Sequence, residues 1–512
     1  MRKKVRIGIL VVVGLFALIF IATLIASPIV ENKIRKSIAE QLPAHIKIND
    51  YDLSVSLISG YVEIKNLKLS PKEESSNVAQ FVSVDKVLVG GVRYLKLLFG
   101  DDIKIKKIVI DNPVVQLDKT TNFQSFTANN SEEKSQQSQS FHINQFTVKG
   151  IKVKLYENDT IPYLSLTQGA ITFKEIAIDE ESRGRKIPFR YESYEVQSEN
   201  FSVLLNPFDR LSLSSMSIKD GELLLNDFSI KTQYEKNQLT TKIKIERDYV
   251  DLVIPQIKAH NFDLNERNDS LLAGIQQLHF KEPNADIYRD KRVADDLSEK
   301  PIYSKSLRTL PFLLAVDTVF IDKASVVYEE KIHSDHPPGK IYFSDLQATV
   351  THLGNAYRKM NANISATFMD STPLHASWLF DIQNPNDTFV FKGQLGKLQA
   401  EALNSFTKPN LNVELEGVLD ETFFTIDANN YKSSVDMRLK YEDFKVEILN
   451  KENKKNKFLS AVTNLFVKKK STDKKGAFKE GKATVSRNLD KSVFNYLWVN
   501  LEAGLKNIML GL

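Results

Sequence analysis

The chain contains no cysteine, and this absence excludes disulfide bonds, a cysteine nucleophile and thiolate zinc sites together. Glycine (20) and proline (16) are also few for 512 residues, so the chain is not of the low-complexity or collagen-like kind. The rest of the composition is typical of folded protein, with 42% hydrophobic and 26% charged residues. At this length, we expect either several domains or one elongated repetitive domain.

Motifs for catalysis and cofactor binding are absent as well. The sequence has no phosphate-binding loop, dinucleotide fingerprint, nucleophile elbow or metalloprotease helix motif. The nearest approach to a metal-ligand cluster is His333-Ser-Asp335-His336, and no second group of ligands stands at a suitable spacing. We interpret it as a solvated loop. We therefore expect no enzyme activity, no cofactor and no metal.

Charge of one sign is not in large excess. The chain has 69 Lys and Arg against 64 Asp and Glu, for a net charge of +5, which is too balanced for a dedicated nucleic-acid binder. No nucleic-acid partner is expected.

The clearest single segment is the apolar run Ile7–Ala26, which has no charged residue. A helix of this length covers roughly 30 Å, the thickness of a bilayer's hydrocarbon core. Arg2, Lys3, Lys4 and Arg6 precede the run, which favours a cytoplasmic N-terminus. We expect a single-pass inner-membrane anchor with most of the chain in the periplasm. A cleaved signal peptide is the alternative.

From Ile46 to about Leu449 apolar and polar residues alternate, as in half-buried β-strands. Helical periodicity is confined to short stretches at Val92–Leu98 and Leu398–Phe406. Within the alternation, apolar residues recur at offsets 0, 3, 5, 8, 10 and 12, in copies that begin at Ile105, Ile143, Leu213, Ile275 and Val316, with a weaker copy at Ile254.

A second pattern, Gly-x-Φ-x-Φ-x-x-Φ-x-Φ with Φ apolar, begins at Gly60, Gly169 and Gly339. Each three-residue step reverses which face of a strand the apolar side chains occupy, so a bulge or tight turn is needed there to restore them to one face. The sequence therefore predicts a mainly β fold: an elongated, curled, repetitive antiparallel sheet, groove-like or sandwich-like, with one apolar face.

Parts of the sequence resemble the AsmA-like envelope proteins of Gram-negative bacteria. The resemblance is carried by Leu57–Leu69 and by Gly100–Leu117, which is similar to the family's N-terminal module of strands broken by a proline. Tyr441–Leu449, Phe458–Asn464 and Arg487–Gly504 are similar to a related family of unknown function. The resemblance implies a single inner-membrane helix, a periplasmic β-groove that carries lipid, and a role in outer-membrane homeostasis or assembly. It implies no catalytic residues.

The C-terminal region has two distinctive parts. Lys468–Lys475 is strongly basic, which is typical either of a solvated linker or of a contact with anionic lipid headgroups. After it, apolar residues at helical spacing predict an amphipathic helix that either caps the end of the sheet or lies in a membrane interface. The residues of this candidate cap or membrane helix are Phe494, Leu497, Trp498, Leu501, Leu505 and Ile508.

These observations divide the chain into an anchor (1–30), a periplasmic repetitive β domain (31–450, with the AsmA-like module at about 31–180), a Lys-rich segment with a short apolar helix (451–482), and a C-terminal strand and amphipathic helix (483–512).

The leading functional hypothesis is a groove that holds the acyl chains of membrane phospholipids. The competing hypotheses are a filled β-sandwich core, and an envelope scaffold or assembly factor that binds other envelope proteins and no lipid. The sequence gives no oligomeric state. The candidate groove-lining residues are repeat positions: Ile108, Ile110, Val115, Leu117, Val148, Val153, Leu155, Ile218, Leu223, Val319, Ile321 and Val326.

Overall fold

The fold is taken from a computed structural model of the 512-residue chain. The structure describes residues 46–56, 60–72, 79–92, 102–118, 140–157, 161–183, 185, 187–267, 270–449 and 478–510. The expected anchor Ile7–Ala26 and most of the Lys-rich segment lie outside these residues. None of the helices in the described part of the chain combines the length and apolar character that a membrane span requires.

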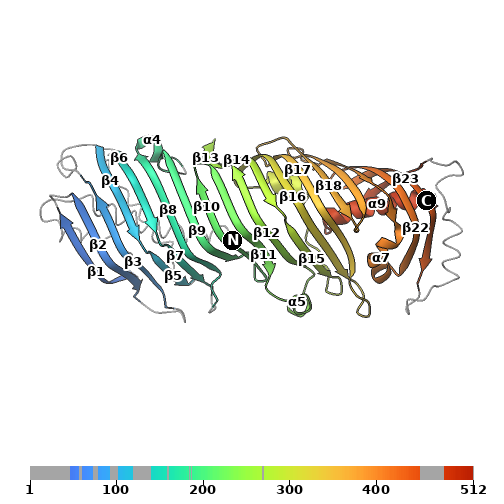
Figure 1. The fold of residues 1–512 in the computed structure, drawn as a ribbon, viewed down its shortest axis with the longest axis horizontal. Helices are drawn as coiled ribbons and strands as arrows, with labels where there is room; N and C mark the ends of the chain where they lie inside the picture. The colour runs from blue at the N-terminus through green and yellow to red at the C-terminus, as the bar shows by residue number, and fades with distance from the viewer. Residues whose placement is uncertain are drawn as a thin grey trace. The chain divides into compact units, whose positions relative to one another are not determined.

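The mainly β fold predicted from the alternation is confirmed (Figure 1). The contacts divide the chain into two units, residues 1–227 with 266–269, and residues 228–265 with 270–512. The strands of unit 1 are β1 (Ile46–Ser56), β2 (Tyr61–Pro71), β3 (Phe81–Gly90), β4 (Asp102–Asp111), β5 (Val114–Asp118), β6 (Ser140–Lys149), β7 (Lys152–Tyr156), β8 (Leu164–Ile178), β9 (Ser193–Leu204) and β10 (Asp209–Lys219), with the short helix α4 (Glu180–Arg183) after β8.

Strands β11 (Glu222–Thr232) and β13 (Asp263–Arg267) extend over the unit boundary. Unit 2 continues with β12 (Asp248–His260), β14 (Ser270–Lys281), β15 (Asn284–Asp290), β16 (Leu313–Lys331), β17 (Gly339–Leu353), β18 (Lys359–Phe368), β19 (Thr372–Asp381), β20 (Phe389–Leu395), β21 (Leu398–Gln399), β22 (Val413–Ala428), β23 (Lys432–Ile448) and β24 (Lys479–Ser486). Its helices are α5 (Lys236–Lys242), α6 (Tyr303–Arg308), the 3₁₀ turn η2 (Ala400–Leu403), α7 (Asn404–Leu411) and α9 (Val493–Leu510). The helical periodicity at Leu398–Phe406 is thus confirmed.

The antiparallel prediction holds for most strand pairs and fails at two places. Consecutive copies of the sequence repeat lie side by side in parallel: β4 and β5 pair with β6 and β7, and β14 and β15 pair with β16. The register is position for position, since Ile105 lies opposite Ile143 and Ile275 opposite Val316. When two copies of the repeat pair in parallel, the bends at their three-residue steps lie side by side. In an antiparallel pair of the same repeats, the bends would not be aligned.

The three-residue steps of both patterns coincide with a left-handed backbone. In each step Φ-x-x-Φ that ends a strand or bends it, the second x has a positive φ, as at Asn112 (53°) between β4 and β5 and Lys323 (50°) inside β16. This conformation lets the strand continue with its apolar residues on the original face. The other residues at this step are Gly150, Asp220, Asn261 and Glu282 in the first pattern, and Asn66, Glu175 and Asp345 in the second.

The described residues bury three apolar clusters. In unit 1, one cluster gathers residues from β1 to β9, such as Ile64, Ile110 and Leu155, and a smaller one gathers Ile105, Ile108 and Ile143. In unit 2, a single cluster lies between strands β17–β24 and the helical segments α6, η2 and α9. Helix α9 packs on β22, β23 and β24, so this filled core lies at the C-terminal end of the unit's sheet (Figure 1).

Candidate functional site

Strand register identifies one apolar face in unit 1. Residues directly opposite one another in a ladder project from the same face of a sheet. Starting from Leu53 in β1, the chain of opposite residues crosses eight strands and every member is apolar. These residues are Leu53, Ile64, Val87, Ile110, Val148, Ile171, Val196 and Ile218; a second such row is Leu69, Val82, Val115, Val153, Leu166, Phe201 and Leu213.

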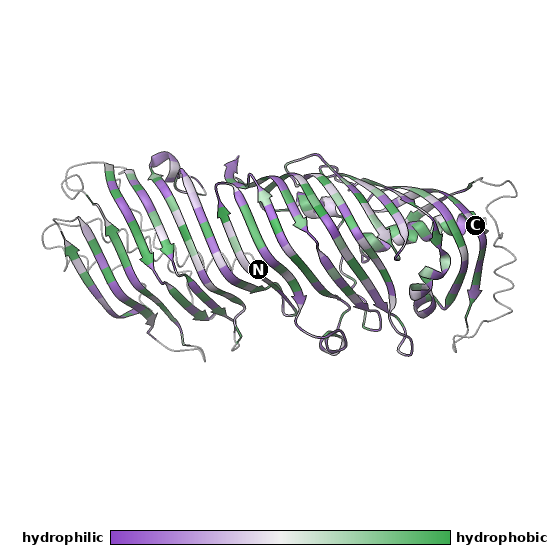
Figure 2. Ribbon diagram, in the orientation of Figure 1, coloured by the Kyte–Doolittle hydropathy of each residue, from purple (hydrophilic) through white to green (hydrophobic). Residues whose placement is uncertain are grey.

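Unit 2 has an apolar face of the same kind. One row, named here the Ile257 row, consists of Ile257, Phe280, Ile321, Ala348, Ile364, Ala376, Gly393, Phe424, Met437 and Gly481. The neighbouring Ala259 row consists of Ala259, Leu278, Val319, Val350, Ala362, Trp378, Phe391, Ile426, Val435 and Ala483. Figure 2 shows the resulting alternation of hydrophobic and hydrophilic residues along the strands.

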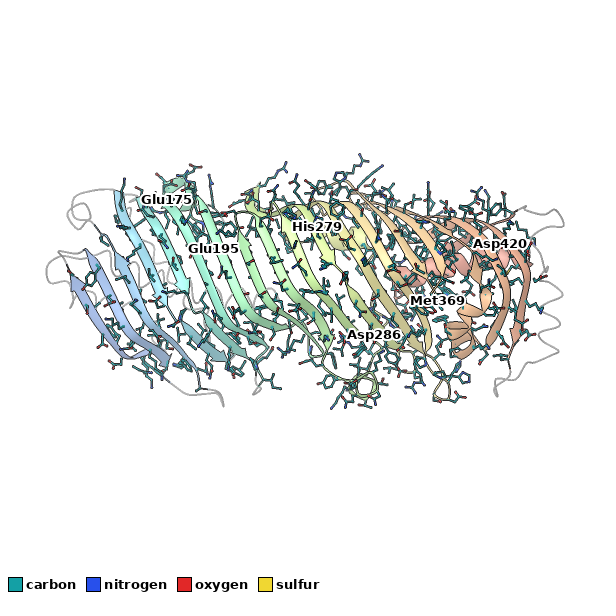
Figure 3. The ribbon with its side chains drawn as sticks, viewed as in Figure 1. Glu175, Glu195, His279, Asp286, Met369 and Asp420 are labelled. Carbon is teal, nitrogen blue, oxygen red and sulfur yellow. The ribbon has the colours of Figure 1, made fainter. Side chains whose placement is uncertain are left out.

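The opposite face of unit 2 is polar. Next to Ile364 in β18 stands the exposed Asn363, and the ladder continues from it through Ser377 to Lys392. His279, labelled in Figure 3, also lies on this face, with its ring stacked on Phe320 at a centroid distance of 4.6 Å. His279 is therefore a sheet-surface residue, and two shallow depressions on this face have mixed polar linings.

All twelve predicted lining residues lie on strands, and the register relates them. Ile110, Val148, Ile218, Val115 and Val153 belong to the two rows of unit 1, while Val319 and Ile321 belong to those of unit 2. Leu117 and Leu155 are opposite each other, as are Ile108 and Phe146, and Val326 lies opposite Phe343. Leu223 is the second residue after the two-residue turn Asp220-Gly221, whose positive φ values (50° and 81°) are those of a type I′ hairpin, so it faces Ile218.

Burial separates these residues into two groups. Ile108, Ile110, Val115, Leu117, Val148 and Leu155 are buried members of the unit 1 clusters, and Val153 packs against them. Ile218, Leu223, Ile321 and Val326 are half-buried, and Val319 is buried, yet none of these five belongs to a cluster. In unit 2, the residues of the Ile257 row from β12 to β17 lie outside the filled core, whereas Val350 of the Ala259 row packs against it. Ile257, Ala259 and Val319 are nevertheless buried.

One end of this open apolar face is closed by charge. Arg289 in β15 donates two hydrogen bonds to Asp248, from Nε at 2.6 Å and from Nη2 at 2.7 Å. Burial alone would lower the pKa of the Arg289 guanidinium, but the bonds and charge of Asp248 outweigh it and hold the pKa above its usual value. Beside it, the Tyr328 hydroxyl donates to Glu330 at 2.7 Å. The apolar band thus ends at a line of paired charges.

Helix α9 covers the last strands of the unit 2 sheet, β22, β23 and β24. Its sheet-facing stripe, Val493, Tyr496, Leu497, Asn500, Gly504 and Ile508, is buried. Of the predicted stripe, Leu497 and Ile508 belong to this buried side, whereas Phe494 (63% exposed) and Trp498 (41% exposed) do not, and Leu501 and Leu505 are half-buried. Asn500 is a polar residue within the buried stripe: its amide is fully buried and accepts a hydrogen bond from Ser433 at 2.8 Å.

The histidine loop was interpreted as solvated, and the structure corrects this for His336. Its ring is only 8% exposed, with Nδ1 3.2 Å from the carbonyl of Pro409 in α7, while Asp335 remains exposed. Among the described residues, no group of three or more His, Asp or Glu side chains is arranged to hold a metal ion.

Sequence reasoning missed the role of the segment that precedes β16. Arg289–Lys305 reads as a charged loop without periodicity, yet Ile302 is fully buried in the C-terminal core and the Tyr303 ring lies 5.8 Å from that of Trp378. The short apolar pair Ile302-Tyr303 within a charged stretch was the available signal.

Comparisons with known proteins add little to this description. No family model and no curated protein matches the sequence. Among solved structures, the crystal structure of OccK8 (OprE) from Pseudomonas aeruginosa aligns with 85% of this chain and 75% of its own, at 7% sequence identity and a TM-score of 0.10. A similarity of that size carries no argument about fold or function.

Proposed function

We propose that this chain is an inner-membrane-anchored periplasmic protein whose apolar sheet face forms a groove for lipid acyl chains, serving lipid transport or outer-membrane homeostasis. The observation that carries the proposal is the Ile257 row of unit 2, whose residues from β12 to β17 are all apolar and lie outside the filled core. The order and spacing of the motifs that resemble AsmA-like proteins support the same function.

The energetics explain why such a face is suited to lipid. An acyl chain in water forfeits roughly 0.8 kcal/mol per methylene, on the order of 10 kcal/mol per chain. From β12 to β17 the Ile257 row crosses three inter-strand steps, which at about 4.8 Å each gives roughly 14 Å of apolar surface. That is about half the thickness of a bilayer's hydrocarbon core, the depth that one acyl chain spans. No nucleotide or metal is needed for such binding.

A second candidate is an envelope scaffold that binds no lipid. The filled core beneath α9 favours it, because Phe380, Phe389 and Tyr441 there are already enclosed by other side chains. The two functions differ in whether the face between β12 and β17 holds a ligand.

Neighbouring valines on β16 provide a matched test. Val326 lies on the apolar face, opposite Phe343, and Val327 on the other face, opposite Tyr342; both are half-buried. We expect Val326→Asp to lower the number of lipids bound per chain at least fivefold in native mass spectrometry of the full chain, because a carboxylate would stand in the groove. Val327→Asp should leave the number of bound lipids unchanged, because this side chain lies on the other face. Lipid held elsewhere on the protein is common to both variants, so only the groove distinguishes them. Equal lipid numbers in the two variants would reject the groove.

A further inference from the structure

Helix α9 has a second apolar stripe, in which Leu501 and Leu505 pack against the C-terminal core while Phe494 and Trp498 are exposed. Phe494, Trp498, Leu501 and Leu505 follow each other at helical spacing, beside the sheet-facing stripe and away from the exposed Lys506. Phe494 and Trp498 are among the few large apolar side chains exposed in the described part of the chain. Apolar surface kept in this way on one helix side is typical of a binding surface.

The ring contacts show which way this stripe points. The Phe494 ring lies 6.2 Å from Trp378 on the apolar face of β19 and 6.4 Å from Tyr303 of α6. The Trp498 ring lies 5.9 Å from Phe406 of α7. These neighbours are on the apolar side of the unit 2 sheet, so the stripe lies on the same side as the Ile257 and Ala259 rows.

No acyl chain fits between α9 and the sheet. A Cβ added at Gly504 would lie 3.0 Å from the Met437 side chain, and one at Gly481 would lie 3.2 Å from the Gly504 carbonyl. Because the Ile257 row runs on through Met437 to Gly481, its last two positions are sealed beneath the helix. A chain that follows the row from β12 therefore meets α9 and must stop against it.

We propose that the second stripe of α9, with Tyr303, is the end wall of an acyl-chain site in unit 2, and that the occupant is a lipid acyl chain. This inference rests on the proposed function. It is supported by the continuity of the stripe with the apolar rows and by the seal beneath the helix. A membrane surface or a second protein as the occupant are outcomes that the test separates.

Photo-crosslinking in cells tests the contact directly. A benzoylphenylalanine residue placed at Trp498, or at Lys506 on the polar side of the same helix, is irradiated in the full chain with acyl chains labelled by radioactive acetate. We expect a labelled adduct from position 498 and at least fivefold less from position 506. A protein adduct without lipid label at position 498 would overturn the proposal.

A second pair of variants distinguishes the groove from a bilayer. Ile364 is a half-buried member of the Ile257 row and Asn363 is its exposed neighbour on the other face. Ile364→Asp should reduce the label at position 498 at least fivefold and Asn363→Asp should not, because only the first blocks the row. Undiminished label with Ile364→Asp would mean that α9 contacts a membrane, which overturns the end wall. Lipid bound in native mass spectrometry but no label at 498 would overturn the end wall alone, whereas no bound lipid at all would overturn both proposals.

Discussion

The docking of α9 depends on one fully buried amide, and its removal has a calculable cost. Asn500 accepts a hydrogen bond from Ser433 at 2.8 Å and donates one to the Tyr496 carbonyl at 2.8 Å. In Asn500→Ala the Ser433 hydroxyl keeps only the carbonyl of Val485, at 3.4 Å. Leaving a buried donor poorly satisfied costs about 1–3 kcal/mol, and the lost volume adds to this. We expect unit 2 to lose roughly 2–3 kcal/mol of unfolding free energy.

Asn495 is the matched control, because it is exposed on the same helix. Asn→Ala raises helix propensity at both positions by a similar few tenths of a kcal/mol, so the difference between the variants isolates the buried contact. Urea denaturation followed by tryptophan fluorescence is the assay, since Trp378 and Trp498 both belong to unit 2. A double-mutant cycle with Ser433→Ala should give a coupling of about 1 kcal/mol. Equal stabilities of the two Asn→Ala variants would refute this account of α9.

Three further predictions concern stability. Asp290 accepts hydrogen bonds from Arg292 (2.6 and 2.9 Å) and Thr240 (3.0 Å), and the Arg292 bonds lower the pKa of the Asp290 carboxyl. The ionised carboxylate therefore stabilises the fold at pH values above its unfolded-state pKa of about 3.9, and this stabilisation is lost as the pH falls below that pKa. Asp290→Asn should therefore cost about 2 kcal/mol at pH 7, and the difference from the unsubstituted chain in urea titrations should shrink below about pH 4; a difference independent of pH would contradict this. Lys323→Gly should raise the unfolding free energy by about 0.5 kcal/mol, because φ is 50° there, whereas Asp322→Gly should lower it; the same sign for both would show that the bend is not strained. Gly481→Ala should lower the melting temperature, because its Cβ would lie 2.5 Å from Ile508 Cγ1, at a cost of about 1–3 kcal/mol; an unchanged melting temperature would mean that α9 has room to move.

The sequence predicts the strands and their common apolar face because both follow from local spacing. The three-residue step from Ile321 to Ala324 predicts a bend in the strand, and the bend forms where Lys323 has a positive φ. Nothing local shows which strands become neighbours. The parallel pairing of β4 with β6 joins residues far apart in the sequence, such as Ile105 and Ile143, and local spacing carries no signal for it.

The sequence also does not show which part of the apolar face is covered by a filled core and which part is not. Val115 and Val326 occupy equivalent repeat positions, yet Val115 belongs to a buried cluster and Val326 does not. Which of them is covered depends on segments distant in sequence, as when α9 and Ile302 close the end of unit 2. The helix itself was predictable from its period, but a helix with two adjacent apolar stripes does not reveal which one the sheet takes.

The lipid content of the protein tests the central claim most directly. The full chain, extracted in mild detergent and washed until free lipid is gone, would be weighed by native mass spectrometry and its bound lipids identified after release. Occupation of the open face between β12 and β17 predicts at least one retained acyl lipid per chain. Protein that emerges with no lipid, and takes none up from added vesicles, would contradict the groove and leave the scaffold.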